Sequence, residues 1–182
     1  MNNQIIRLIK GVFISIFLFY GSFPAVSQEE SGEARRRPLR LTASIGHTYL
    51  PKDTRVGKDV AILPSFGLDI EYWFSRRFAV GLHNDLELLH FQVVEQNDII
   101  IERDYPVLVT FDLIFNVYKG LTVYFGPGAE LESHENFFVT RIGIEYEVEI
   151  GNNWDLHPVF FHDVRRNAYD TFSFGLGVGK RF

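Results

Sequence analysis

Apolar residues occupy every second position along most of the chain from Leu39 onward. This spacing is typical of β-strands that have one apolar and one polar face. The alternation is clearest within eight segments, each part of a predicted strand: 39–46, 66–74, 78–88, 107–116, 121–132, 138–150, 154–160 and 172–179. No segment has a convincing helical period. The pattern therefore predicts eight strands of about 10 to 15 residues, longer than the usual strands of soluble sheets and long enough to cross a bilayer at a tilt.

The connectors between these strands alternate in length. Ser75–Arg77, Tyr118–Gly120 and Gly151–Asn153 are tight turns, whereas 51–59, 92–106, 133–136 and 165–170 are mostly longer loops. Short turns on one side and longer loops on the other are typical of bacterial outer-membrane barrels. The even strand count places both termini of the chain in the periplasm. Ile99, Ile100 and Ile101 in the second loop predict a hairpin above the membrane, with an edge for a partner strand.

The composition excludes several classes of protein. Hydrophobic residues make up 46% of the 182 residues, which argues against disorder. The chain has no cysteine, which excludes disulfides, thiolate zinc sites, cysteine nucleophiles and a lipidated N-terminal cysteine. A net charge of −5 argues against nucleic-acid binding driven by bulk charge.

Residues 1–27 have the three parts of a secretory signal peptide. Arg7 and Lys10 precede an apolar run over 11–20, and Ala25 and Ser27 fit the small positions of a cleavage site. The run is too short for a transmembrane helix, which needs about 20 apolar residues. We expect cleavage near Ser27, a flexible arm over 28–38 and a barrel domain over 39–182.

The faces of the strands decide between two kinds of barrel. A soluble, lipocalin-like lipid binder would turn its apolar face inward. Here the polar rows carry many glycines, which suit the crowded interior of a small barrel, and the bulky apolar rows suit lipid. Aromatic residues also lie beside the short turns, as in a membrane belt: Phe74, Phe78, Phe115, Tyr118 and Trp154. The sequence predicts an all-β, eight-stranded antiparallel up-and-down transmembrane barrel.

The polar rows would then line the lumen. The predicted lumen network is Arg40, Asp69, Glu71, His83, Asp85, Glu87, Asp112, Glu130, Arg141, Glu145, Glu147, Asp155 and His157. Glu132 and Glu149 follow the same rows, and Arg181 is a further inward cation. Acids outnumber bases, and eight strands leave room for little beyond side chains. We expect a plugged, hydrogen-bonded interior without an open pore.

Two groups of residues are candidates for catalysis. His83, Asp85 and Glu87 share an inward face, as do Asp155 and His157. Such groups suit a metal or acid–base chemistry, but they lie in the inner half or near mid-barrel and favour a structural polar cluster. The second group lies at the outer rim: Ser133, His134, Glu135, His162 and Asp163. The neighbours Ser133 and His134 face opposite ways, and the His-x-Ser pairing of lipid A deacylase barrels is missing. We expect no catalytic site, no metal and no cofactor.

Basic residues in the predicted outer loops suggest contacts with lipopolysaccharide phosphates. They are Lys52, Arg55, Lys58, Arg103, Arg165 and Arg166. Cations at this boundary are expected to anchor the barrel and do not require an enzymatic role.

The last strand, 172–182, keeps its alternation up to the terminal Phe182. It resembles the strand that outer-membrane barrels present to their assembly machinery. With the alternation, loop lengths and leader, residues 39–182 resemble the small OmpA/OmpX-like outer-membrane β-barrels of Gram-negative bacteria. The resemblance implies a monomer among outer-membrane lipid and lipopolysaccharide, with a structural, surface-interaction or adhesion role. A narrow cation channel and a lipid-modifying enzyme remain alternatives.

Overall fold

The computed structural model describes residues 37–50, 62–94, 100–133 and 135–182. The predicted signal peptide and most of the predicted arm lie outside these residues, so both stay predictions. Lys52, Arg55, Lys58, His134 and Ile99 also lie outside them.

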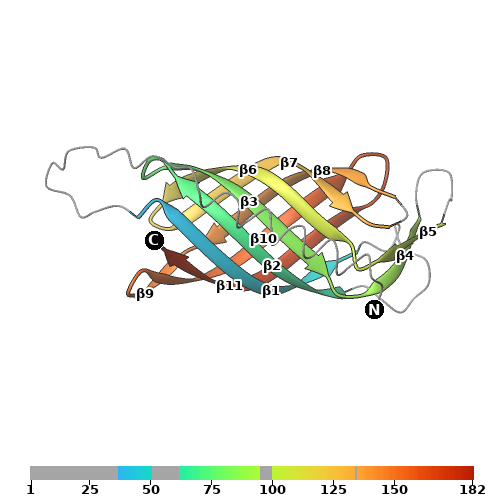
Figure 1. Ribbon diagram of the computed structural model, residues 1–182, viewed down its shortest axis with the longest axis horizontal. Helices are drawn as coiled ribbons and strands as arrows, with labels where there is room; N and C mark the ends of the chain where they lie inside the picture. Colours follow the sequence, from blue (N-terminus) through green and yellow to red (C-terminus); the bar gives the residue numbers. More distant parts are fainter. Residues whose placement is uncertain (1–36, 51–61, 95–99, 134) are drawn as a thin grey trace, which may run out of the picture. The chain divides into compact units, whose positions relative to one another are not determined.

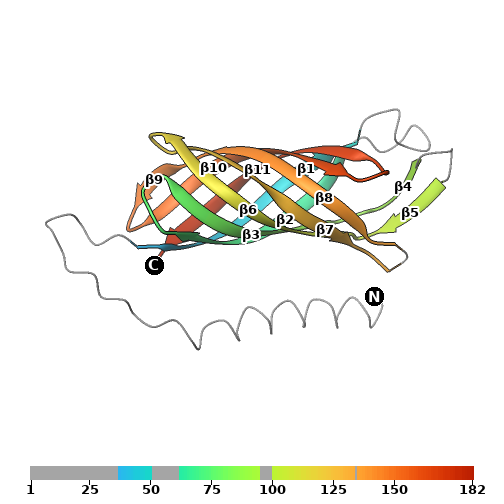
Figure 2. The same cartoon turned by 90° about the horizontal axis from the view of Figure 1, so that it is seen from above.

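The described strands form a closed antiparallel barrel of eight strands (Figures 1 and 2). The barrel strands are β1 Leu39–Tyr49, β2 Ile62–Trp73, β3 Phe78–Glu87, β6 Val107–Tyr118, β7 Leu121–Leu131, β8 Phe137–Tyr146, β10 Trp154–Arg165 and β11 Asp170–Arg181. Each strand pairs with the next along the chain, and β1 pairs with β11 to close the ring. The predicted fold class is confirmed. No helix in the described ranges is long and apolar enough to cross a membrane.

The polar face of each strand points inward and the apolar face outward. Along β8, buried and exposed residues alternate without a break. Arg141 in this strand is buried, while its neighbour Ile142 is 61% exposed. A soluble barrel would show the opposite arrangement, because its exposed surface would be polar. The exposed apolar rows are those of a barrel that faces lipid.

The three tight turns lie at the same end of the barrel as the described termini. At the first, the Ser75 hydroxyl accepts hydrogen bonds from the backbone N–H groups of Arg77 and Phe78, at 3.1 and 2.9 Å. The turn between β6 and β7 contains Gly120 at φ +87°, a left-handed conformation that glycine adopts without strain. At this end the Phe182 N–H also donates to the Leu39 carbonyl, at 2.8 Å. We call this end the inner end and the opposite one the outer end.

The predicted strand over 138–150 is interrupted. β8 ends at Tyr146, and the short strand β9, Val148–Gly151, continues after an irregularity at Glu147. The Glu147 N–H donates to the Gly120 carbonyl, at 2.9 Å, in register with the preceding pair Leu121 and Tyr146. Glu149 lies at the inner rim, beside the register shift between Trp154 and Asp155, and is exposed, so its expected place in the lumen is wrong.

The predicted hairpin in the second outer loop is present. β4 His90–Val94 pairs with β5 Ile100–Asp104 and extends β3 and β6 beyond the barrel. Phe91 and Val93 are buried in an apolar cluster with Leu50, Leu63, Phe137 and Tyr169. This outer cap packs hairpin side chains against the last inward residues of the barrel. A second apolar cluster lies within the barrel: Trp73, Ala79, Ile114, Tyr124 and Phe161.

Candidate functional site

The described residues form three charged clusters in the lumen, which we name by position. The inner cluster surrounds Arg40, the middle cluster surrounds Arg141, and the outer cluster surrounds Glu130. Each forms because inward positions of different strands carry opposite charges at the same height in the barrel. Buried guanidinium groups require such partners, since an unpaired charge away from water is strongly unfavourable.

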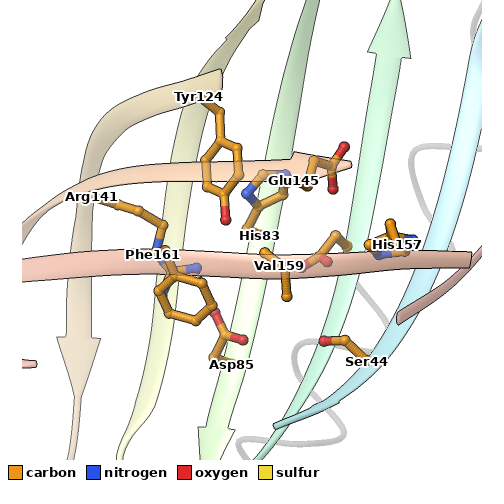
Figure 3. A pocket seen from close by; sticks show the side chains of 10 residues that line it. Ser44, His83, Asp85, Tyr124, Arg141, Glu145, His157, Val159 and Phe161 are labelled. Carbon is orange, nitrogen blue, oxygen red and sulfur yellow. The ribbon is translucent and has the colours of Figure 1, made fainter. Parts of the chain in front are cut away.

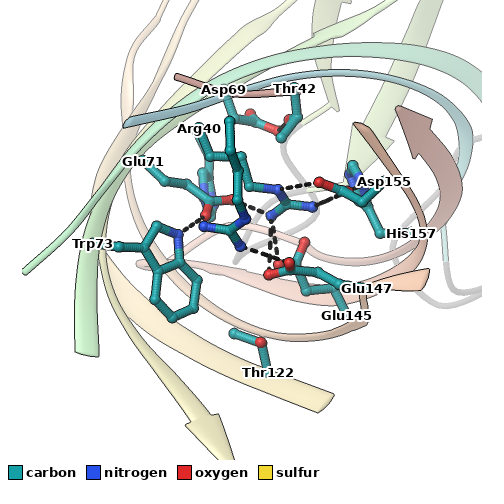
Figure 4. Close-up of polar contacts among 12 residues, drawn as sticks. Arg40, Thr42, Asp69, Glu71, Trp73, Thr122, Glu145, Glu147, Asp155 and His157 are labelled. Carbon is teal, nitrogen blue, oxygen red and sulfur yellow. Dashed lines mark hydrogen bonds and ion pairs between the residues drawn. The ribbon is translucent and has the colours of Figure 1, made fainter. Parts of the chain in front are cut away.

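The inner cluster joins four strands through a single side chain (Figure 4). The Arg40 guanidinium donates to Glu71 at 2.6 Å, to Glu145 at 2.8 Å and to both carboxylate oxygens of Asp155, at 2.7 and 3.1 Å. The Arg40 side chain is completely buried. Glu71 also accepts a hydrogen bond from the Trp73 indole, at 2.7 Å. Arg40 therefore ties β1 to β2, β8 and β10.

The middle cluster is built from β8, β10 and β3. Arg141 donates to both carboxylate oxygens of Asp163, at 2.7 and 2.8 Å, and to Asp85. Its guanidinium carbon lies 4.0 Å from the centroid of the Phe161 ring. Nearby, His83 lies 2.9 Å from Asp112. Ion pairing and ring stacking together fill the middle of the barrel.

A small cavity separates the inner and middle clusters (Figure 3). Its volume is about 20 Å³, which is room for about one water molecule. The lining is Ser44, Asp69, His83, Asp85, Tyr124, Arg141, Glu145, His157, Val159 and Phe161. A cavity of this size does not by itself make a channel for hydrated ions.

The outer cluster gathers two arginines around one carboxylate. Glu130 accepts hydrogen bonds from Arg103, from Arg165 and from the Tyr169 hydroxyl. Burial raises the pKa of the Tyr169 hydroxyl well above its usual value, so this group keeps its proton and acts as a donor. Arg103 comes from the β4–β5 hairpin and also donates to the Glu135 carbonyl, at 2.8 Å. The cluster thus fastens the hairpin to the barrel beneath the outer cap.

Two predicted loop cations belong to this cluster. Arg103 and Arg165 are 0% and 2% exposed, so the expectation that they face lipopolysaccharide is wrong. Both side chains turn inward because Glu130 offers a buried countercharge. Arg166 is exposed, as a contact with lipopolysaccharide would require.

The structure places the predicted lumen residues inside the barrel. Eleven of the thirteen are buried: Arg40, Glu71, His83, Asp85, Glu87, Asp112, Glu130, Arg141, Glu145, Asp155 and His157. Asp69 is half-buried and accepts a hydrogen bond from Thr42, at 2.7 Å. Glu147 is half-buried at the inner end and accepts one from Arg181, at 2.6 Å.

Sequence reasoning missed Asp163 and Tyr169 as lumen residues. Asp163 is expected at the outer rim, but it has the same parity as Asp155 and His157 on β10, which marks it as inward. Tyr169 lies in a connector, where alternation gives no signal. Its burial follows from the apolar cap and from Glu130, neither of which the local sequence reveals.

Glycines make room for the large lumen side chains. A Cβ on Gly177 would lie 2.2 Å from Nε2 of His157, and one on Gly143 would lie 2.2 Å from the Tyr124 ring. Both distances are far shorter than a van der Waals contact. Any larger residue at these two positions would displace its partner.

The rim residues do not assemble a hydrolytic site in the described part of the chain. His162 points outward and stacks on Phe172 with ring centroids 4.2 Å apart, whereas Asp163 points inward to Arg141. Ser133 donates to Glu132, at 2.6 Å. Among the described residues, no group of histidine and acidic side chains is arranged to hold a metal ion.

Comparison with known proteins gives matches at the level of structure. No protein-family model matches the chain. No curated protein matches it either. One similar structure is Ail, the attachment invasion locus protein of Yersinia pestis, in complex with the heparin analogue sucrose octasulfate. Its sequence is 17% identical and the TM-score is 0.50, and the match covers 80% of this chain and 99% of that one. The N-terminal β-barrel domain of Pseudomonas aeruginosa OprF is 14% identical with a TM-score of 0.50, over 80% of this chain and 98% of that one. Together with the closed eight-stranded barrel, these matches show that the chain has the fold of the small outer-membrane β-barrels of the OmpA/OmpX type.

Proposed function

We propose that this chain is a non-enzymatic outer-membrane protein of a Gram-negative bacterium, which acts through its outer loops while a sealed barrel holds them at the cell surface. The observation that carries the proposal is the combination of an apolar exterior with a filled interior. Outward side chains such as Ile45, Phe125 and Ile142 are more than half exposed. Such a surface is stable in lipid and would aggregate in water.

The filled lumen argues for a supporting role of the barrel. Three charged clusters occupy successive heights, and the apolar cap lies over the outermost of them. A barrel sealed in this way resists deformation and gives the outer segments a fixed base. The β4–β5 hairpin is the largest described outer segment, and its backbone edges offer pairing sites for an extended partner segment.

Surface adhesion is the form of this role that we favour. Ail, which has the same fold, is an attachment protein, and the hairpin here is held rigidly by Arg103. The proposed surroundings are outer-membrane lipid and lipopolysaccharide. The proposed assembly route is recognition of the strand ending at Phe182 by the barrel assembly machinery.

Membrane fractionation followed by gel electrophoresis of boiled and unboiled samples tests the proposal. We expect the protein in the outer membrane and a faster-migrating unboiled band, because a folded barrel resists detergent unfolding. A soluble periplasmic protein without a band shift would contradict the proposal. It would redirect the search to small hydrophobic ligands.

A narrow cation channel is the second candidate, because among the described residues buried carboxylates outnumber buried arginines by eight to four. Planar-bilayer recordings distinguish the two functions. The sealed barrel is expected to give no current steps. Cation-selective steps would favour the channel. Unchanged lipid A masses in a deletion strain would argue against a lipid-modifying enzyme.

A further inference from the structure

Exposed charges are distributed unequally between the two ends of the barrel. At the inner end, the described charged residues that are at least partly exposed are six cations, Arg37, Arg76, Arg77, Lys119, Lys180 and Arg181, and two carboxylates, Glu147 and Glu149. At the outer end they are one cation, Arg166, and five carboxylates, Glu102, Asp104, Glu132, Glu135 and Asp170. The described surface is therefore cationic beside the inner leaflet and acidic at the other end.

The inner cations lie beside aromatic side chains that face lipid. On the barrel wall, Lys180 of β11 is paired in register with Trp154 of β10. The Lys180 ammonium lies 4.4 Å from the Trp154 ring centroid and 6.0 Å from that of Phe182. Trp154 is 41% exposed. An indole at this height sits among headgroups, and the ammonium above it reaches the phosphate level.

A second inner turn repeats this arrangement. The Lys119 ammonium lies 5.2 Å from the Tyr118 ring centroid, and Tyr118 is 63% exposed. Arg77 is exposed in the turn closed by Ser75, next in sequence to Phe78, whose ring stacks on that of Phe74 with centroids 6.4 Å apart. Two described sites, at Lys180 and at Lys119, thus combine an exposed ring with a cation.

We infer that the inner end of the barrel binds anionic phospholipid headgroups, with Lys180 and Trp154 forming the principal site. Charge complementarity selects this partner, because an ammonium and a guanidinium attract a phosphodiester lipid with net negative charge more strongly than a zwitterionic lipid. The rings bury in the acyl–headgroup boundary and hold the cations at phosphate depth. The inference rests on the proposed membrane location.

The two tryptophans of the chain supply a local measurement. Trp154 faces lipid, whereas Trp73 is 4% exposed and lies in the lumen, so brominated lipids in contact with the barrel quench Trp154 selectively. The protein is folded into vesicles of brominated phosphatidylglycerol in unlabelled phosphatidylcholine, and into the converse mixture. The ratio of the two quenching efficiencies gives the relative affinity at this site. A Trp154→Phe variant supplies the background.

We expect the wild type to prefer phosphatidylglycerol about fivefold at low salt, because one cation near an anionic surface contributes about this factor. The preference should fall toward one in concentrated salt and in Lys180→Gln, and Lys180→Arg should retain it. Arg166→Gln, at the outer end, is the matched control and should leave it unchanged.

Equal quenching by both lipids in the wild type at low salt would overturn the inference. A preference that Lys180→Gln leaves intact would overturn it too. These outcomes differ from those expected if the proposed membrane location were wrong. In that case neither brominated lipid would quench Trp154, and the unboiled gel band would not shift.

Discussion

At the scale of single residues, the barrel depends on charges that have no access to water. Arg141 is 1% exposed and has carboxylates on two other strands as partners. Removing one member of such an ion pair leaves its partners buried without a countercharge. This lowers the free energy of unfolding more than replacing the whole ion pair by apolar residues would.

We predict that Arg141→Ala lowers the free energy of unfolding by about 3 to 5 kcal/mol, because Asp163 and Asp85 lose their countercharge. Urea unfolding in vesicles measures this change. Arg166→Ala is the matched control, since it removes the same kind of side chain from an exposed position between β10 and β11, and should change little. Equal stability of both variants would mean that the middle cluster contributes nothing.

Gly143 has no side chain, and the Tyr124 ring fills the space beside it. Gly143→Ala should cost about 1 to 3 kcal/mol, because the added methyl group overlaps the Tyr124 ring. A double variant with Tyr124→Leu should recover part of this loss. A cost that is the same in both backgrounds would show that the ring is not the obstacle.

At the scale of elements, the hairpin β4–β5 is stabilised by what lies beneath it. An isolated two-stranded hairpin is marginal in water. Here Phe91 and Val93 enter the outer cap, and Arg103 reaches Glu130 in the lumen. The hairpin is therefore ordered by its attachment to the barrel.

We expect Arg103→Gln to loosen the hairpin while the barrel stays folded. Amide hydrogen exchange in β4 and β5 should accelerate, and the gel shift on boiling should persist. Gln92→Ala is the matched control, because it removes an exposed hydrogen bond to Glu102 within the same hairpin, 2.9 Å long. Unchanged exchange in Arg103→Gln would contradict the proposed attachment.

Elements were predictable where local alternation determines them. The period of two and the alternating connector lengths suffice for eight strands, their order and the lipid-facing side. The interruption at Glu147 was not predictable, because the apolar alternation of Ile144, Tyr146, Val148 and Ile150 continues through it. The inward direction of Arg103 was not predictable, because it depends on Glu130, which lies on another strand. Arg165 has the same inward parity as Asp163 on β10, so alternation continued past residue 160 predicts its place in the lumen.

At the scale of the whole molecule, charged side chains lie in two environments, the buried lumen and the exposed inner end. Lumen ion pairs are buried and poorly screened by salt, while the inner-end cations are exposed and readily screened. The same protein therefore has electrostatic interactions with opposite sensitivities to ionic strength.

We predict that raising sodium chloride from about 0.05 to 0.5 M, which shortens the Debye length from about 14 to 4 Å, changes the free energy of unfolding by less than about 1 kcal/mol. Urea titrations in zwitterionic vesicles at both salt concentrations measure it, because such vesicles remove the contribution of anionic lipid. A loss of several kcal/mol would mean that salt reaches the lumen clusters.

The reach of Arg40 has a consequence for the order of events in folding. Its partner Asp155 is 115 positions away in the sequence, and the two meet only when the first strand finds the last ones. Contacts of such separation cannot guide the early steps of insertion, since the chain between them must be ordered first. Substitutions at Arg40 are therefore expected to leave the rate of membrane insertion nearly unchanged and to accelerate unfolding. The inner cluster therefore forms at the end of folding, and its contacts determine how slowly the folded barrel unfolds.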